Sequence, residues 1–161
     1  MRKQRGFTIP ELLITMGIIA ILFGFISINL IHLQRRSYLT TTVDTLISDL
    51  YSQQNKAMVG DTQGSGAISA HGVYFESNRY VLFRGSSYNP LDTSNFPVNL
   101  DPSLTFSSIT FLSCPSCNVI FSKISGETGL MSGSNTVTLT DSTNNEQKIL
   151  EINKYGAITV Q

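Results

Sequence analysis

Residues 6–33 read GFTIPELLITMGIIAILFGFISINLIHL, and this stretch decides how the rest of the chain is organised. From Leu12 to Leu33 there are 22 consecutive residues without Asp, Glu, Lys or Arg. An apolar run of this length is sufficient for a helix that crosses a bilayer. In a chain of 161 residues it argues against a purely cytosolic soluble enzyme and predicts a small head on a membrane anchor.

The charges that flank this run are asymmetric, although the formal net charge of the chain is zero. Arg2, Lys3 and Arg5 precede the run, whereas six basic and ten acidic residues follow Arg36. Basic residues collect on the cytoplasmic side of membrane segments. We therefore expect a single-pass protein of the cytoplasmic (inner) membrane, with its N-terminus in the cytoplasm and its head outside.

A secretory signal peptide also begins with a basic segment and an apolar run, so the cleavage site distinguishes it from an anchor. Residues 26–33 lack the small residues that signal peptidase reads, and Gln34, Arg35 and Arg36 follow them. We therefore expect the apolar segment to be retained. The alternative cleavage site precedes it, within RGFTIPELLI at residues 5–14.

These residues closely resemble the N-terminus of the type IV prepilin and pseudopilin family. The family's leader ends in Gly, its mature chain begins with an aromatic residue, and Glu occupies the fifth mature position. Gly6, Phe7 and Glu11 match these features in turn. The resemblance implies that a membrane-embedded prepilin peptidase cuts after Gly6 and methylates the new amine of Phe7. Pro10 departs from the aliphatic residue that usually precedes the Glu.

Glu11 is the charged residue of this segment, and a charge beside an apolar membrane run is costly. Cleavage after Gly6 places Pro10 and Glu11 in the first helical turn, where a missing N–H costs nothing and the helix dipole favours a carboxylate. The resemblance implies that Glu11 pairs with the N-terminal amine of a neighbouring subunit and sets the axial register of a filament. The alternative is an interfacial glutamate without an assembly role.

Apolar residues continue at helical spacing beyond the membrane segment and predict an amphipathic helix. Gly60 and the glycine-rich residues 61–66, DTQGSG, predict its end, so we expect one helix from Pro10 to Val59. The stripe consists of Leu39, Val43, Leu46, Ile47, Leu50, Ala57 and Met58.

From Gly72 onward the pattern changes to short alternating strands separated by turn residues. Ser77 and Asn78 are predicted to join the first two strands in a hairpin. The residues from Gly85 to Pro102 contain three prolines and are predicted to form a loop. The predicted strands are 73–76, 79–83, 104–112, 119–122, 136–140, 148–152 and 157–160, the last three as a meander.

One long helix followed by short strands predicts an α+β, pilin-like fold, with the helix packed on an antiparallel β-sheet or small β-sandwich. We expect four parts: a prepilin leader at 1–6, a transmembrane and assembly helix at 7–33, its amphipathic continuation at 34–59 and a β-rich globular head at 60–161.

The head resembles the H-type minor pseudopilins in the order of its elements. The resemblance rests on LISDLYSQQNKAM at residues 46–58 followed by GVYFESNRYVLFRG at residues 72–85. It is a likeness of pattern and implies no binding residue.

Cys114 and Cys117 are the only cysteines and stand in the order CPSC. Such a pair can be a redox motif, half of a zinc site or a structural disulfide. Zinc needs more ligands than His32 and His71 can supply from their positions, and a redox pair typically begins a helix, whereas CPSC lies between two predicted strands. We therefore favour a disulfide that pins a turn in an oxidising compartment, and expect no metal.

No other group of residues predicts catalysis or nucleic-acid binding. No nucleophile, base and orienting group form a recognisable pattern, His71 is expected at the surface or in a turn, and DTQGSG lacks the Lys-Ser/Thr of a phosphate-binding loop. We expect a protein that is not an enzyme and has no cofactor. The net charge from Gln34 onward is −2, so no nucleic acid is expected as a partner.

The sequence thus predicts a structural subunit, a minor pseudopilin or minor pilin, of a type II secretion pseudopilus or a type IV pilus. Its expected partners are the prepilin peptidase, other pilins or pseudopilins through the N-terminal helix, the inner-membrane assembly platform and the lipid bilayer. Gly17, Ala20 and Gly24 would permit close helix approach. Two alternatives stay open: a membrane-anchored thiol oxidoreductase using Cys114 and Cys117, and a DNA-uptake or adhesive pilus-tip protein.

Overall fold

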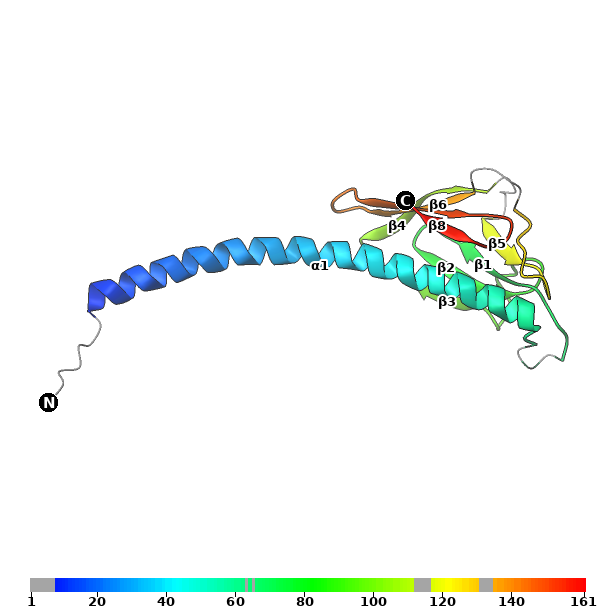
Figure 1. The fold of residues 1–161 in the computed structure, drawn as a ribbon. Helices are drawn as coiled ribbons and strands as arrows, with labels where there is room; N and C mark the ends of the chain where they lie inside the picture. Colours follow the sequence, from blue (N-terminus) through cyan, green and yellow to red (C-terminus); the bar gives the residue numbers. More distant parts are fainter. Residues whose placement is uncertain (1–7, 63, 65, 112–116, 131–134) are drawn as a thin grey trace. The chain divides into compact units, whose positions relative to one another are not determined.

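The computed structural model describes residues 8–62, 64, 66–111, 117–130 and 135–161, and for residues 25–37 it describes the backbone alone. Within this part of the chain, one α-helix, α1 (Ile9–Val59), precedes eight β-strands (Figure 1). The chain divides into two units at Tyr38 and Leu39. The α+β fold, a long helix followed by antiparallel sheets, is confirmed.

The strands form two four-stranded antiparallel sheets. The first sheet has the order β3-β2-β1-β5 and the second has the order β4-β6-β7-β8. Because β6, β7 and β8 are neighbours in the second sheet, the predicted meander of the last three strands is confirmed. The strands are β1 (His71–Phe75), β2 (Arg79–Arg84), β3 (Phe96–Asn99), β4 (Leu104–Thr110), β5 (Asn118–Phe121), β6 (Thr136–Asp141), β7 (Gln147–Ile152) and β8 (Ile158–Val160).

The C-terminal end of α1 lies where the glycines predict it. Gly60 has a positive φ of 70°, and its N–H donates to the carbonyl of Ala57 at 3.3 Å. The N–H of Asp61 donates to the carbonyl of Lys56 at 2.9 Å. These two bonds form a Schellman motif, in which a residue in the left-handed region satisfies the last carbonyls of a helix.

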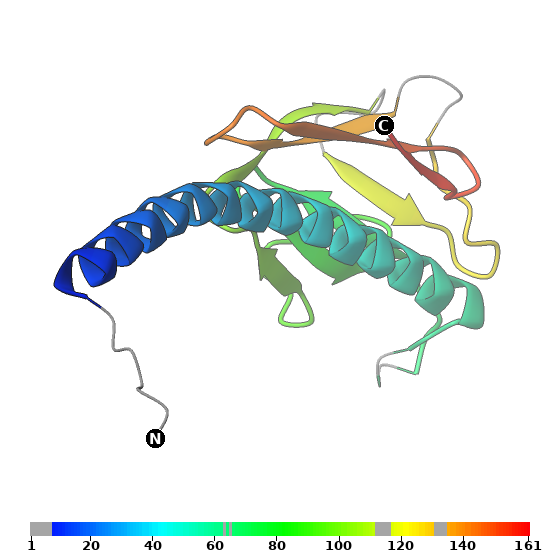
Figure 2. The ribbon, with the colours of Figure 1, turned by 60° about the vertical axis from the view of Figure 1, so that its left-hand side comes forward.

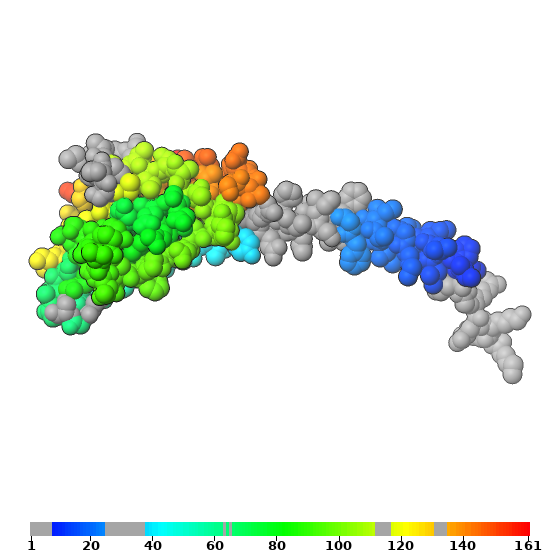
Figure 3. Space-filling model, turned by 180° about the vertical axis from the view of Figure 1, so that it is seen from behind, coloured from blue at the N-terminus to red at the C-terminus, as the bar shows by residue number. Residues whose placement is uncertain are grey.

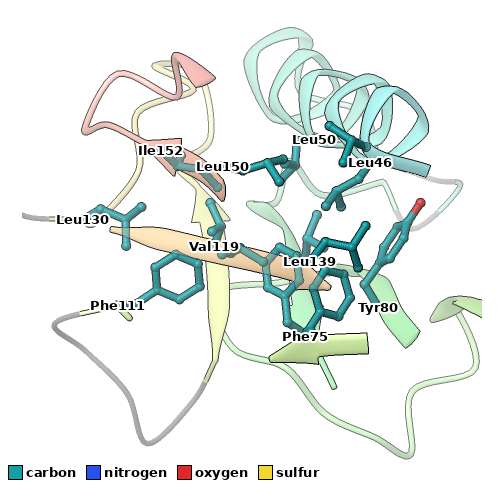
Figure 4. Packing of buried hydrophobic residues seen from close by; sticks show 14 of the residues in the cluster. Leu46, Leu50, Phe75, Tyr80, Phe111, Val119, Leu130, Leu139, Leu150 and Ile152 are labelled. Atoms are coloured by element: carbon teal, nitrogen blue, oxygen red, sulfur yellow. The ribbon is translucent and has the colours of Figure 1, made fainter. Parts of the chain in front are cut away.

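The core of the head lies between the C-terminal half of α1 and both sheets. Leu46 and Leu50 are fully buried and point from α1 towards strand residues that include Leu139 (Figure 4). Their spacing of four residues places them on one helix face. Of the predicted stripe, Ile47 is only half-buried and Met58 is exposed. The stripe residues that are buried are Leu39, Val43, Leu46, Leu50 and Ala57.

The first hairpin of the head is also as predicted. β1 and β2 pair from His71 and Arg84 to Phe75 and Tyr80. The N–H of Glu76 donates to the carbonyl of Arg79 at 2.9 Å, which closes the turn at Ser77 and Asn78.

The residues from Gly85 to Pro102 are not one loop, and that prediction is wrong. They contain β3, which forms an edge of the first sheet and, among the described strands, pairs with β2 alone. The N–H of Leu100, the residue after β3, donates to the carbonyl of Asn78, which continues the antiparallel register of β3 with β2. In this register the N–H of every second residue points towards β2. The nitrogen of Pro97 is on the other side and points away from β2. A proline at that position of an edge strand removes no hydrogen bond from the sheet. The other predicted strands agree with the structure to within two residues at each described end.

One hydrogen bond joins α1 to the first sheet inside the head. The Tyr80 hydroxyl donates to Oδ2 of Asp49 at 2.6 Å, and Tyr80 is only 1% exposed. In Figure 4 the hydroxyl points towards α1. Burial raises the pKa of Tyr80 above its ordinary value near 10, and the Asp49 carboxylate raises it further. Both effects favour the neutral phenol.

We predict that Tyr80→Phe lowers the free energy of unfolding by about 1.5–3 kcal/mol, because a hydrogen bond to a charged group is lost. Thermal unfolding of the detergent-solubilised chain, followed by circular dichroism, measures this change. Tyr155→Phe is the matched control, since the Tyr155 side chain is 67% exposed. Equal melting temperatures for wild type and Tyr80→Phe would contradict a stabilising role of this bond.

The same bond predicts a pH dependence. The folded protein retains the Tyr80 proton at pH values where the unfolded chain releases it, so the stability from this group is complete below the unfolded pKa of about 10 and decreases as the pH rises above it. The stability difference between wild type and Tyr80→Phe should therefore shrink from about pH 9 to pH 12. A difference that stays constant over this range would be inconsistent with the assignment.

Candidate functional site

Glu11 lies in the first turn of α1, three residues after Thr8. The carbonyl of Thr8 accepts the first helical hydrogen bond, from the N–H of Leu12 at 3.1 Å, so Thr8 is the N-cap residue. The Glu11 side chain is exposed, close to the positive end of the helix dipole. Gly6 and Phe7, the predicted processing residues, lie outside the described part of the chain.

The role of Thr8 was not predicted, although the sequence contains a signal for it. Thr8 and Glu11 have the S/T-x-x-E spacing of a capping box, which is typical of helix N-termini. The helix accordingly begins at Ile9, one residue before the predicted start at Pro10. Pro10 lies in the first turn of the helix. Backbone N–H groups in this turn have no intrahelical acceptor, so the missing N–H of proline breaks no hydrogen bond.

The surface of α1 that follows Glu11 is apolar on every side. Ten large apolar residues between positions 9 and 23 are 50–80% exposed, and they occupy nearly consecutive positions, so no face of this segment is polar. Figure 3 shows this surface in blue. A helix that is hydrophobic all round requires apolar surroundings. The residues are Ile9, Leu12, Leu13, Ile14, Met16, Ile18, Ile19, Ile21, Leu22 and Phe23.

Gly17 and Gly24 lie within this apolar segment. Apart from the two chain neighbours and the backbone of its own helix turn, a Cβ atom added at either position would meet no described atom within 4 Å. Neither glycine is therefore required by contacts inside the described chain, and both leave room for a neighbouring helix.

The predicted membrane span over residues 7–33 includes positions at which no side chain is described. Within the described residues, no helix combines the length and the apolarity that crossing a membrane would require.

Of the predicted disulfide, only Cys117 belongs to the described part of the chain. It is half-buried, directly precedes β5, and its carbonyl accepts a hydrogen bond from the N–H of Phe75 at 2.8 Å. Cys114 lies outside the described residues, so the disulfide stays a prediction. Among the residues that are described, no three His, Cys, Asp or Glu side chains are grouped as metal ligands would be.

The expectation that His71 lies at the surface or in a turn is wrong. His71 is the first residue of β1 and is fully buried. Alternation along the strand places it on the same face as the buried Val73 and Phe75. Its Nε2 lies 3.1 Å from the carbonyl oxygen of Asp61, which provides the partner that a buried imidazole N–H needs.

The comparisons with known proteins agree with the interpretation of the N-terminus. A family model described as the prokaryotic N-terminal methylation motif matches residues 1–27. Comparison with curated proteins and with solved structures gave no match. The matched residues include Gly6, Phe7 and Glu11 and the apolar segment up to Ser27. This match supports the resemblance of residues 1–27 to the N-terminus of the type IV pilin and pseudopilin family.

Proposed function

We propose that this protein is a minor pseudopilin or minor pilin, a structural subunit of a type II secretion pseudopilus or a type IV pilus. The observation that carries the proposal is the surface of α1 between Ile9 and Phe23, which is apolar on all sides and has one carboxylate, Glu11, at its start. Such a surface suits first a bilayer and then a bundle of like helices. The order of elements in the head supports an H-type subunit.

In this proposal residues 7–33 anchor the precursor in the inner membrane, with the N-terminus in the cytoplasm and the head outside. Prepilin peptidase removes residues 1–6 and methylates Phe7. The assembly platform then moves the subunit from the bilayer into a periplasmic pseudopilus or a surface pilus. The amphipathic helix at 34–59 and the head at 60–161 supply the outer part of the filament.

In this proposal Glu11 forms a charge pair with a neighbouring subunit during assembly. Moving a carboxylate into an apolar helix bundle is unfavourable unless an opposite charge accompanies it. The amine of Phe7 in a neighbouring subunit is that charge, and pairing fixes the axial position of one helix against the next. Gly17, Ala20 and Gly24 allow the backbones to approach.

The head has a structural role in this proposal and performs no enzymatic reaction. The cysteines Cys114 and Cys117 form a stabilising disulfide. A thiol oxidoreductase would instead require both cysteines and not Glu11, and a DNA-uptake tip protein would bind labelled duplex DNA at moderate salt.

We predict that Glu11→Ala lowers incorporation of the subunit into filaments by at least about tenfold, because the neighbouring amine is left unpaired in an apolar bundle. The measurement is the ratio of subunit in sheared filaments to subunit in the membrane of a host that depends on this protein. Asp44→Ala is the matched control, since Asp44 is an exposed carboxylate on the same helix.

Normal incorporation of Glu11→Ala would refute the proposed mechanism. Replacing Cys114 and Cys117 together by Ser should leave incorporation above the level of Glu11→Ala. Loss of function in the cysteine variant alone, with Glu11→Ala active, would favour the oxidoreductase.

A further inference from the structure

Nδ1 of His71 and Nε of Arg84 are buried polar atoms that have no hydrogen-bond partner in the described part of the chain. His71 belongs to β1 and is fully buried, and Arg84 belongs to the neighbouring strand β2. The two residues are directly opposite each other in the register of these strands. Directly opposite residues share a face of the sheet, with Cβ atoms about 5 Å apart. The two side chains are therefore neighbours.

Another nitrogen of each side chain is bonded to the connection between α1 and β1. Figure 2 shows the chain turning back from the C-terminal end of α1 towards β1. Nε2 of His71 lies 3.1 Å from the carbonyl oxygen of Asp61, and Nη2 of Arg84 donates to the carbonyl of Ala67 at 2.7 Å. Neither side chain can turn its unpaired nitrogen elsewhere without losing one of these bonds.

The contact with Asp61 determines which ring nitrogen of His71 carries the proton. A carbonyl oxygen can only accept a hydrogen bond, so Nε2 is protonated. In the neutral imidazole Nδ1 is then an acceptor. The charged imidazole would add a second positive charge directly opposite Arg84, which is unfavourable. The unpaired nitrogen of His71 is thus an acceptor, whereas the unpaired Nε–H of Arg84 is a donor.

These two atoms need a partner that both donates and accepts. Buried polar groups are normally paired with protein or with ordered water. A water molecule can donate to Nδ1 and accept from Nε–H, and a buried water typically makes about three hydrogen bonds. An anion would satisfy Arg84 but would offer no hydrogen to His71, and a cation on Nδ1 would be repelled by Arg84.

We propose that one buried water molecule bridges His71 and Arg84. It donates to Nδ1 of His71 and accepts from Nε–H of Arg84. The water completes a continuous series of hydrogen bonds from the carbonyl of Asp61 to the carbonyl of Ala67. This series holds the segment that follows α1 against the first sheet, so the water helps to position the end of the helix. The proposal concerns the head alone and is independent of the filament role.

The test is NMR spectroscopy of the full chain in detergent micelles. Nuclear Overhauser effects from water should reach Hε of Arg84 and Hε1 of His71, with the sign of a water that stays bound for longer than the protein takes to tumble. Nitrogen-15 spectra should show Nε2 of His71 as protonated and Nδ1 as an unprotonated nitrogen that accepts a hydrogen bond. Arg79 is the internal control, because its Nε donates to Oε2 of Glu76 at 2.7 Å and its Hε should show no such effect.

Two variants test whether a single water is shared. His71→Phe removes the acceptor and should abolish the water effect at Hε of Arg84. Arg84→Lys keeps the positive charge but places a methylene where Nε was. It should abolish the water effect at Hε1 of His71 and shift the Nδ1 signal towards that of a nitrogen without a hydrogen bond. Arg79→Lys is the matched control and should change neither signal of His71. Arg84→Lys keeps the test valid if His71→Phe fails to fold.

Four results would overturn the proposal. The first is the absence of a long-lived water effect at both His71 and Arg84. The second is a proton on Nδ1 of His71 at neutral pH. The third is a scalar coupling between Nε of Arg84 and Nδ1 of His71, which would show that the two atoms bond directly. The fourth is an unchanged water effect at Hε of Arg84 in folded His71→Phe, which would mean that the water is not shared.

Discussion

Burial of one helical stripe against two sheets is the interaction on which the whole head depends. Each sheet has a face that must be covered, and α1 contributes fully buried residues such as Leu46 and Leu50 to the core that covers both. Polar contacts then fix the helix in position. Tyr80 binds Asp49 near the middle of the packed segment, and near its end Nε2 of Gln54 donates to the carbonyls of Gly126 and Tyr155 at 3.0 and 2.8 Å.

The same helix has a different surface before Tyr38. Up to Phe23 its apolar residues occupy nearly every position and are exposed, whereas from Leu39 onward they recur every three or four residues and are buried. The first pattern is that of a helix among lipids or like helices, and the second is that of a helix on one side of a folded domain. The family model of the prokaryotic N-terminal methylation motif matches residues 1–27, which include this exposed apolar segment.

Features that depend on local sequence were predictable. The stripe on α1, the Ser77–Asn78 turn and the Gly6, Phe7 and Glu11 motif each reside within a few consecutive residues or one helical period. Features that depend on tertiary context were not. β3 was not predicted because it contains Pro97, and proline normally indicates a loop. Pro97 is compatible with this strand because the strand lies at the edge of the sheet.

Polar residues in the interior show the same limit. Nothing in the sequence around His71 or Gln53 distinguishes a buried position from an exposed one, because their burial is set by segments far away in the chain. His71 receives a backbone partner from Asp61, whereas Gln53 faces a cavity.

The most direct test of the central claim is analysis of the intact mass and the N-terminal peptide of the membrane-extracted protein, with and without an active prepilin peptidase. The account predicts a chain that begins at N-methylated Phe7 only when the peptidase is active, and an intact Met1 terminus when it is not. An uncut chain in the presence of the active peptidase, or cleavage beyond Ser27, would contradict it.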